Sequence, residues 1–380
     1  MNSGDPRGYI PCMPRTVAGQ KEDDMETMTQ TPETPTATQS HNPEHILKIG
    51  MGFWASKTVL AAVNFKLFTL LARQPLSSET IRKTLGLHPR AYLDFLDALV
   101  ALGFLARKGM GADAVYANAP DANFFLDRNK PSYLGGILEM CNNRLYRFWA
   151  DLEEGLKTGL PQNEIKHSTD TGKNQFEAIY GNPEALAEFM QAMSGIQMGA
   201  FMAFARQFDF SRYATFCDVG GANGSLCLQV AKNHAHLQCT NFDLPAVENI
   251  AQAAIARSGL SSRIQTAAGD FFHDRLPAAD VIAMGNILHD WNEEEKLVLI
   301  KKVHAALPKG GAFVCIENII DNDRSENAFG LLMSLNMLIE TKTGADFTFN
   351  DFDRLAHQAG FSRTEWMPLA GPTSAAIAYK

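Results

Sequence analysis

Three acidic residues stand near the ends of short apolar runs, where they could bind a small polar ligand. Asp218 opens the glycine-rich stretch 218–224, Asp243 lies 19 residues after Gly224, and Asp270 precedes Phe271. A carboxylate can accept both hydroxyls of a ribose, and an acid beside an aromatic ring suits an adenine. The glycine stretch lacks the spacing of a dinucleotide fingerprint, and no Walker lysine follows it. This pattern predicts a nucleoside ligand without a phosphate cradle, which S-adenosylmethionine would satisfy.

A histidine follows the next apolar run at the start of a helix. The run Val281–Gly285 leads into Ile287-Leu288-His289-Asp290-Trp291, and Asn292 with three glutamates is typical of a helix N-terminus. A lone histidine is more often structural, but this one falls at the mouth of the predicted ligand site. Imidazole, with a reference pKa of about 6.5, is suited to take a proton from a bound ligand at neutral pH. His289 is therefore a candidate general base.

The elements that must position these residues alternate between strand and helix. Five β-type runs separated by helical stretches predict a parallel sheet covered by helices on both faces. Two later runs lie too close together for a helical crossover and should pair antiparallel. The expected fold is an α/β, Rossmann-like sheet of seven strands, at 216–219, 238–242, 264–268, 281–285, 313–317, 363–367 and 374–379.

The N-terminal part shows a helix, turn, helix and β-wing pattern. A helical stretch over 46–72, a short helix ending at Leu85, a helix from Pro89 to Leu102 and runs at 104–108 and 114–117 indicate a winged helix. Residues 45–125 are locally basic, which could indicate DNA binding. However, the would-be recognition helix has one Arg, two Asp and mostly apolar residues, whereas groove readers need polar side chains. We therefore expect this domain to form a homodimer.

Composition narrows the remaining possibilities. The net charge of −8 gives no support to nucleic-acid or membrane-surface binding, and the apolar runs fall short of the ~20 residues of a membrane span. The six cysteines are scattered without metal-like spacing, and no secretory signal precedes residue 45. These features predict a cytoplasmic protein. The expected organisation is a disordered tail (1–43), a winged-helix dimerisation domain (44–125), a helical connector (126–205) and a cofactor-binding domain (206–380).

The motifs Asp-Val-Gly-Gly-Ala-Asn-Gly, Asn-Phe-Asp-Leu-Pro-Ala-Val, Gly-Asp-Phe-Phe and Leu-His-Asp-Trp follow one another behind the winged helix. Their order resembles the caffeate- and hydroxyindole-type small-molecule O-methyltransferases over residues 45–380. The resemblance implies a class I methyltransferase fold, S-adenosylmethionine as cofactor, no metal and a dimer. It also implies a cofactor site made of Asp218, Gly220, Gly221, Gly224, Asp243, Leu244, Asp270 and Phe271.

By the same resemblance, His289 is the base, and Glu317 and Asp346 are the acids that flank it. The second acid is Glu in plant members, so the shorter Asp346 should make a looser or water-mediated contact. Gly285 departs from the family pattern, which often has Lys or Arg at this position, and this should weaken one cofactor contact. The expected acceptor pocket consists of Phe176, Tyr180, Met190, Met193, Asp290, Met333, Asn336 and Met337, although core packing explains any one of them equally well.

Together these features predict methyl transfer from S-adenosylmethionine to a hydroxyl of a flat phenolic or enolic molecule. One alternative is a related enzyme that binds the cofactor but performs decarboxylation or pericyclisation. Another is a winged-helix regulator that senses S-adenosylmethionine.

Overall fold

The computed structural model describes residues 41–166 and 179–380. Most of the predicted tail (1–43) and the predicted acceptor residue Phe176 therefore lie outside the described residues. The chain divides into two compact units, Met1–Gly50 and Met51–Lys380. The described part of the first unit contains the helix α1 (Glu44–Gly50).

The second unit begins with a small domain built around a three-stranded antiparallel sheet. Its strands run in the order β1, β3, β2. Buried side chains such as Phe68, Leu96, Leu99 and Tyr116 form its core. Its elements are α2 (Gly52–Asn64), α3 (Leu67–Leu71), β1 (Leu76–Ser77), α4 (Ser78–Leu85), α5 (Tyr92–Ala101), β2 (Leu105–Lys108), η1 (Gly111–Asp113), β3 (Val115–Asn118) and α6 (Pro120–Phe125).

The expected N-terminal helices are present with different boundaries. The stretch predicted as one helix over 46–72 is broken, because Lys66 adopts a left-handed backbone conformation (φ 59°) between α2 and α3. Helix α5 begins at Tyr92 rather than Pro89. Ser77 caps α4 by accepting the N–H of Thr80, as a serine at this position predicts.

A run of short helices links this domain to the large sheet. They are α7 (Gly135–Met140), η2 (Cys141–Leu145), α8 (Tyr146–Phe148), η3 (Trp149–Asp151), α9 (Leu152–Thr158) and the long α11 (Pro183–Gln207). Helices α7 and α11 pack closely, since a Cβ at Gly136 would lie 3.2 Å from the backbone of α11.

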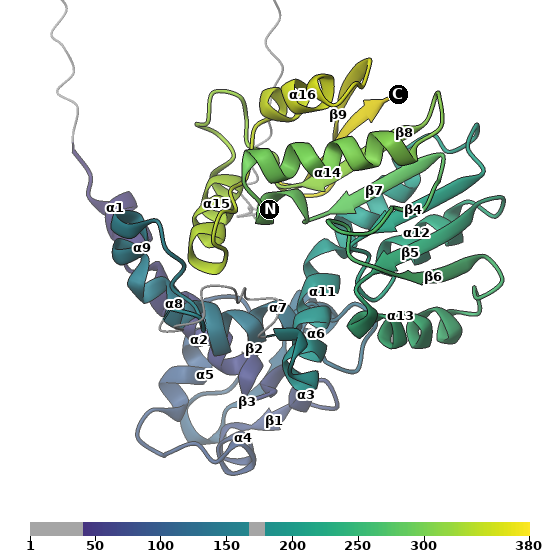
Figure 1. The fold of residues 1–380 in the computed structure, drawn as a ribbon. Helices are drawn as coiled ribbons and strands as arrows, with labels where there is room; N and C mark the ends of the chain where they lie inside the picture. Colours follow the sequence, from purple (N-terminus) through teal and green to yellow (C-terminus); the bar gives the residue numbers. More distant parts are fainter. Residues whose placement is uncertain (1–40, 167–178) are drawn as a thin grey trace, which may run out of the picture. The chain divides into compact units, whose positions relative to one another are not determined.

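The large sheet has seven strands in the order β6, β5, β4, β7, β8, β10, β9 (Figure 1). The first five strands along this order are parallel, and β10 pairs antiparallel with both β8 and β9, as predicted. The strands are β4 (Thr215–Val219), β5 (Gln238–Asp243), β6 (Ile264–Ala268), β7 (Val281–Gly285), β8 (Ala312–Glu317), β9 (Arg363–Pro368) and β10 (Ser374–Tyr379). Winding reverses between β4 and β7, so their carboxyl ends mark the expected ligand crevice.

Helices cover both faces of this sheet. Alternate residues along β4 divide between two cores, with Phe216 buried in one and Cys217 in the other. Helices α11, α12 (Ser225–Asn233) and α13 (Pro245–Ser258) pack on the Phe216 face. Helices α14 (Glu293–Ala306) and α16 (Phe349–Gln358) pack on the other. The remaining elements are η4 (Leu288–Asp290) after β7 and α15 (Ala328–Glu340) after β8.

Among the described residues, one stretch is long and apolar enough to cross a membrane by length and composition alone: Glu44–Asn64, with 21 residues and a mean hydropathy of 1.3 over an 18-residue window. The core helix of a soluble protein and a signal sequence pass the same test, so this stretch does not by itself contradict the expectation of no membrane span.

Candidate active site

A cavity of about 710 Å³ opens at the carboxyl ends of β4, β5, β6 and β7. Asp243 lies on its wall at the end of β5. One carboxylate oxygen accepts the N–H of Ala222 and the other accepts the N–H of Leu244, both at 2.7 Å. Because each carboxylate oxygen has a second lone pair, Asp243 can still accept two hydroxyls from a ligand. Asp243 therefore has the acceptor capacity that a ligand with two neighbouring hydroxyls needs.

The glycine turn after β4 brings backbone close to this cavity. Gly220 lines the cavity with φ 74°, and a Cβ there would lie 2.4 Å from Ile287. A Cβ at Gly221 would lie 2.1 Å from Oδ1 of Asn241, so the turn excludes any side chain at either position. Gly224 (φ 82°) is the N-cap residue of α12.

Only some of the other predicted cofactor residues line this cavity. Leu244, Asp270 and Phe271 line the cavity, whereas Asp218, Gly221 and Gly224 are not among the described residues that line it. Burial, with the nearby charge of Asp243, raises the pKa of Asp218 to about 8. Asp270 accepts the N–H of Phe272 at 2.7 Å and contacts His273 at 2.8 Å.

Gly285 also lines this cavity. A Cβ there would lie 3.1 Å from Phe201 and 3.2 Å from Oε1 of Gln197, a side chain that lines the same cavity. The space beside position 285, where the family resemblance implies a basic residue, is thus occupied by side chains of α11.

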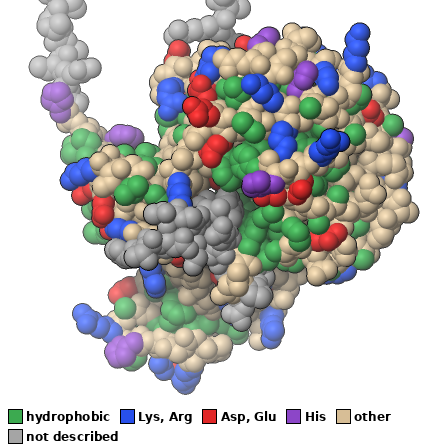
Figure 2. All heavy atoms as spheres, in the orientation of Figure 1, with side chains coloured by type: hydrophobic (Ala, Val, Ile, Leu, Met, Phe, Trp, Pro, Cys, Tyr) green, Lys and Arg blue, Asp and Glu red, His purple; other side chains and the backbone are tan. Residues whose placement is uncertain are grey.

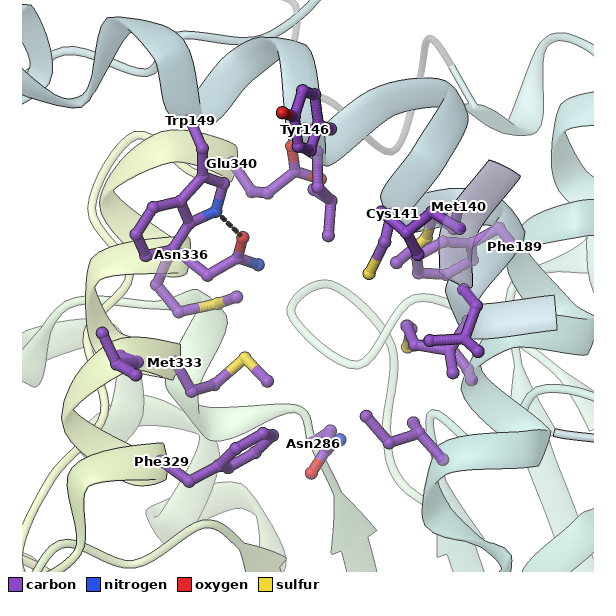
Figure 3. Close-up of a pocket in the computed structure, with 18 of the residues that line it drawn as sticks. Met140, Cys141, Tyr146, Trp149, Phe189, Asn286, Phe329, Met333, Asn336 and Glu340 are labelled. Carbon is purple, nitrogen blue, oxygen red and sulfur yellow. Dashed lines mark hydrogen bonds between the residues drawn. The ribbon is translucent and has the colours of Figure 1, made fainter. Parts of the chain in front are cut away.

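A second cavity, of about 780 Å³, lies between α15 and the helices α7, η2 and α8 (Figure 3). Its walls are largely apolar and sulfur-rich, and Met140, Cys141 and Met333 point toward its interior. A polar pair interrupts this surface, because Nε1 of Trp149 donates to Oδ1 of Asn336 at 2.9 Å. The composition suits a flat apolar molecule with few polar groups.

The predicted acceptor residues divide between the two cavities. Met193, Asp290, Met333, Asn336 and Met337 line the second cavity. Tyr180 and Met190 line the strand-end cavity instead. Phe189, Met193, Asn286 and Asp290 line both, so the two spaces share a wall.

His289 lies in η4 beside this shared wall and lines the second cavity. Its side chain is almost completely buried. Nδ1 lies 3.4 Å from Oε2 of Glu317 and 3.4 Å from Oδ1 of Asp346, while Nε2 lies 3.8 Å from Oδ1 of Asp290. Among the described residues, His289 Nδ1 and both carboxylate oxygens of Asp346 have no hydrogen-bond partner. The two acids predicted to flank His289 are therefore beside it, at distances longer than a hydrogen bond.

Glu317 ends β8 and fixes the corner that carries the histidine. Its Oε1 accepts the main-chain N–H groups of Ile287 and Leu288, each at 3.0 Å. Asn286 precedes this corner with a left-handed backbone (φ 52°). The capping box of Asn292 and Glu295 then starts α14, as the sequence predicts.

Three acids shape the electrostatics around this imidazole: Asp290, Glu317 and Asp346, which we call the acid cluster. Burial lowers the pKa of His289, but the charges of the acid cluster outweigh burial and raise it above its ordinary value. Burial raises the pKa of Glu317 and of Asp290, and His289 opposes both shifts. The imidazole and these carboxylates therefore titrate as a coupled group.

Sequence reasoning missed several groups near the site. Trp149, Cys141 and Glu340 line the second cavity. They lie on short helices and at the end of α15, where the spacing of apolar residues does not predict which way a side chain faces. Arg144 bonds Glu164 at 2.5 Å and lies 3.2 Å from Glu340. The buried Lys296 was also missed, because α14 otherwise reads as a solvent-facing charged helix.

The chain matches two family models, an O-methyltransferase domain over residues 149–362 and an O-methyltransferase dimerisation domain over residues 47–128. The chain belongs to the O-methyltransferase family. It is 38% identical over 343 residues to the tetracenomycin polyketide synthesis 8-O-methyl transferase TcmO of Streptomyces glaucescens, covering 90% of this chain and 98% of the relative.

Two further relatives agree with this assignment. The 3-hydroxy-5-methyl-1-naphthoate 3-O-methyltransferase of Streptomyces sahachiroi is 31% identical over 332 residues, covering 87% of this O-methyltransferase and 92% of the relative. The crystal structure of human N-acetylserotonin methyltransferase in complex with SAM matches with a TM-score of 0.83 at 26% identity, covering 91% and 99% of the two chains. This chain is thus an S-adenosylmethionine-dependent O-methyltransferase with a class I fold and a dimerisation domain.

Proposed function

We propose that this O-methyltransferase methylates a hydroxyl of a fused-ring phenol or enol, with His289 as the general base and without a metal ion. We assign the second cavity to the acceptor and call it the acceptor cavity. The observation that carries this proposal is the position of His289, which lines this cavity close to the residues shared with the strand-end cavity. Two carboxylates, those of Glu317 and Asp346, lie 3.4 Å from its Nδ1.

The direction of the imidazole supports a different role for each ring nitrogen. Nδ1 faces Glu317 and Asp346, so in this proposal it is the nitrogen that keeps its proton. Nε2 is then free to take the proton of the acceptor hydroxyl as the oxygen attacks. The acid cluster stabilises the imidazolium that results, which makes His289 a stronger base than a solvent-exposed histidine.

When bound, S-adenosylmethionine supplies the methyl group as an electrophilic carbon on sulfur. Asp243 would hold its ribose, Leu244, Asp270 and Phe271 its adenine end, and the turn at Gly220 its methionine side. The chain's own contribution would be mainly orientation, because the second cavity would hold the acceptor hydroxyl within reach of Nε2 and beside the methyl donor.

The acceptor cavity supports an acceptor larger than one ring. Ligand sites range over roughly 300–1,000 Å³, and 780 Å³ falls in the upper part of that range. Methionine and aromatic side chains suit a flat ring system. The names of the two bacterial relatives, a polyketide and a naphthoate methyltransferase, support the same class of acceptor.

We also propose a cytoplasmic homodimer that binds neither nucleic acid nor membrane. The dimerisation-domain match supports the dimer. On the face shown in Figure 2, Lys and Arg side chains are scattered among acidic ones rather than gathered in a stripe. That distribution differs from the footprint of a DNA-binding surface.

The test is a panel of phenols with one to four fused rings, incubated with isotopically labelled cofactor and analysed by mass spectrometry. We expect labelled O-methyl products from members with two or more rings. Loss of carbon dioxide or a rearranged skeleton without label would favour the decarboxylase or pericyclase alternative. Retention of random duplex DNA on a filter at low salt, with no product, would favour the regulator.

A further inference from the structure

Lys296, in the first turns of α14, carries a buried ammonium group. The residue is 5% exposed, although lysine is almost never fully buried unless it is paired. Nζ donates to the carbonyl oxygen of Trp291 at 2.5 Å and to that of Ala345 at 2.8 Å. It also lies 5.4 Å from the centre of the Phe347 ring. Two acceptors and an aromatic face together suit a charged ammonium.

The two carbonyls belong to the segments that carry groups of the proposed catalytic site. Trp291 follows His289 and Asp290 directly in the chain, and Ala345 directly precedes Asp346. The two segments are separated by more than 50 residues, yet one side chain joins them. Movement of either segment would change the distance between Nδ1 of His289 and Oδ1 of Asp346, which is 3.4 Å in this structure.

The charge of Lys296 also acts on the acid cluster. Its ammonium interacts electrostatically with Glu317, Asp346, Asp290 and the Cys315 thiol, and Cys315 lies 4.0 Å from Glu317. Burial lowers the pKa of Lys296, and the acids oppose that shift. With a neutral imidazole and ionised acids, three negative charges face one positive charge. Without Lys296 these three charges would be buried beside His289 with no other lysine or arginine near them in the described part of the chain, and His289 would bind a proton more tightly.

We propose that Lys296 is a positioning residue for methyl transfer, which joins the His289 and Asp346 segments and offsets the buried acids so that His289 can return to its neutral form. This inference rests on the proposed role of His289 as the base. It assigns Lys296 no contact with the acceptor or the cofactor.

The first test needs no acceptor. The full-length protein is labelled with ¹⁵N-histidine, and His289 is assigned by loss of its signals in His289→Gln. In Lys296→Met we expect the titration midpoint of His289 to rise by about one pH unit, because a positive charge is lost nearby. Lys296→Arg should restore most of the wild-type midpoint. Lys302→Met is the matched control, since Lys302 on the same helix also donates to a carbonyl, that of Phe272 at 2.8 Å. It should leave the midpoint unchanged.

An unchanged midpoint in a folded Lys296→Met protein, judged by circular dichroism and calorimetric binding of S-adenosylmethionine, would overturn the proposal. If Lys296→Met does not fold, NMR of the Lys296 ammonium in the wild-type protein decides. An ammonium that stays charged at pH 7–8 supports the proposal, and a neutral amine overturns it.

The second test separates this inference from the role of His289. With any phenol that the panel identifies, the acid limb of the kcat/KM profile should move to higher pH in Lys296→Met and return in Lys296→Arg. A lower kcat with an unmoved limb would reduce Lys296 to a structural residue. Methyl transfer that survives in His289→Gln would instead refute the base assignment. The effect of Lys296→Met on the titration midpoint of His289 would still hold.

Discussion

Nδ1 of His289 lies 3.4 Å from Oε2 of Glu317, while the other oxygen of that carboxylate accepts the N–H groups of Ile287 and Leu288. One side chain therefore both shapes the corner after β7 and faces the imidazole at its tip. The same carboxylate thus holds the backbone of the corner and lies beside the proposed base.

Replacement of His289 by alanine should abolish most methyl transfer. General base catalysis contributes roughly 10²–10⁴-fold, so we expect a loss of that order in kcat. Affinity for S-adenosylmethionine, measured by calorimetry, should stay close to wild type, because His289 does not line the strand-end cavity. His357→Ala, an exposed histidine on α16, is the control. Transfer near the parental rate in His289→Ala would refute the assignment.

Glu317→Gln should move the acid limb of the pH profile to lower pH. The ionised Glu317 stabilises the imidazolium and so raises the pKa of His289. Glutamine keeps an oxygen for the two main-chain N–H groups but removes the charge, so the neutral imidazole appears at lower pH. We expect a shift of about one pH unit and a lower maximal rate. An acid limb that stays in place or moves to higher pH would contradict the proposed electrostatic interaction between Glu317 and His289.

Asp243→Ala should weaken the binding of S-adenosylmethionine. Hydrogen bonds to a charged group contribute about 1.5–3 kcal/mol, so the Kd should rise roughly 10-fold to 150-fold. Isothermal titration calorimetry measures this directly. Asp323→Ala, an exposed acid that does not line the strand-end cavity, should bind normally. Equal affinities for the two variants would rule out the ribose contact.

Met333→Trp should select against large acceptors. Met333 points into the acceptor cavity, and a tryptophan there would occupy space that a multi-ring acceptor needs. We expect the KM for three-ring and four-ring phenols to rise at least tenfold relative to that for a two-ring phenol. Calorimetric cofactor affinity should stay unchanged. Equal changes in KM for phenols with two, three and four rings would show that the number of rings does not determine how well an acceptor fits the cavity.

Chelation of metal ions should leave methyl transfer unchanged. His289, Glu317 and Asp346 place their polar atoms within 4.8 Å of one another, an arrangement that we interpret as a proton-transfer site. Activity is compared before and after dialysis against EDTA, with added Mg²⁺ as the matched sample. Loss of activity that Mg²⁺ restores would contradict this interpretation.

The sheet and the strand-end site could be predicted because their signals are local. Runs of β-branched residues, the glycine turn at 220–224 and the acids after the strands follow from backbone geometry within a few residues. The position of His289 in a turn could be predicted for the same reason, because Asn292 marks the start of the next helix three residues later.

The acceptor cavity was harder to predict because distant segments build it. Met190 and Met193 are both methionines on α11, but Met190 lines only the strand-end cavity of the two, whereas Met193 lines both. Lys296 looks like a surface lysine in the sequence, and only the approach of Ala345 reveals its buried partners.

The partition between the two cavities has a consequence for how such a protein can diversify. Strand ends and their turns build most of the strand-end cavity, whereas separate helices build most of the acceptor cavity, and few residues line both. Under the proposed function, mutations on those helices would change which molecule is methylated and leave the cofactor site intact. Selection for new products would then act on α7, α8 and α15 first, and the sheet would change last.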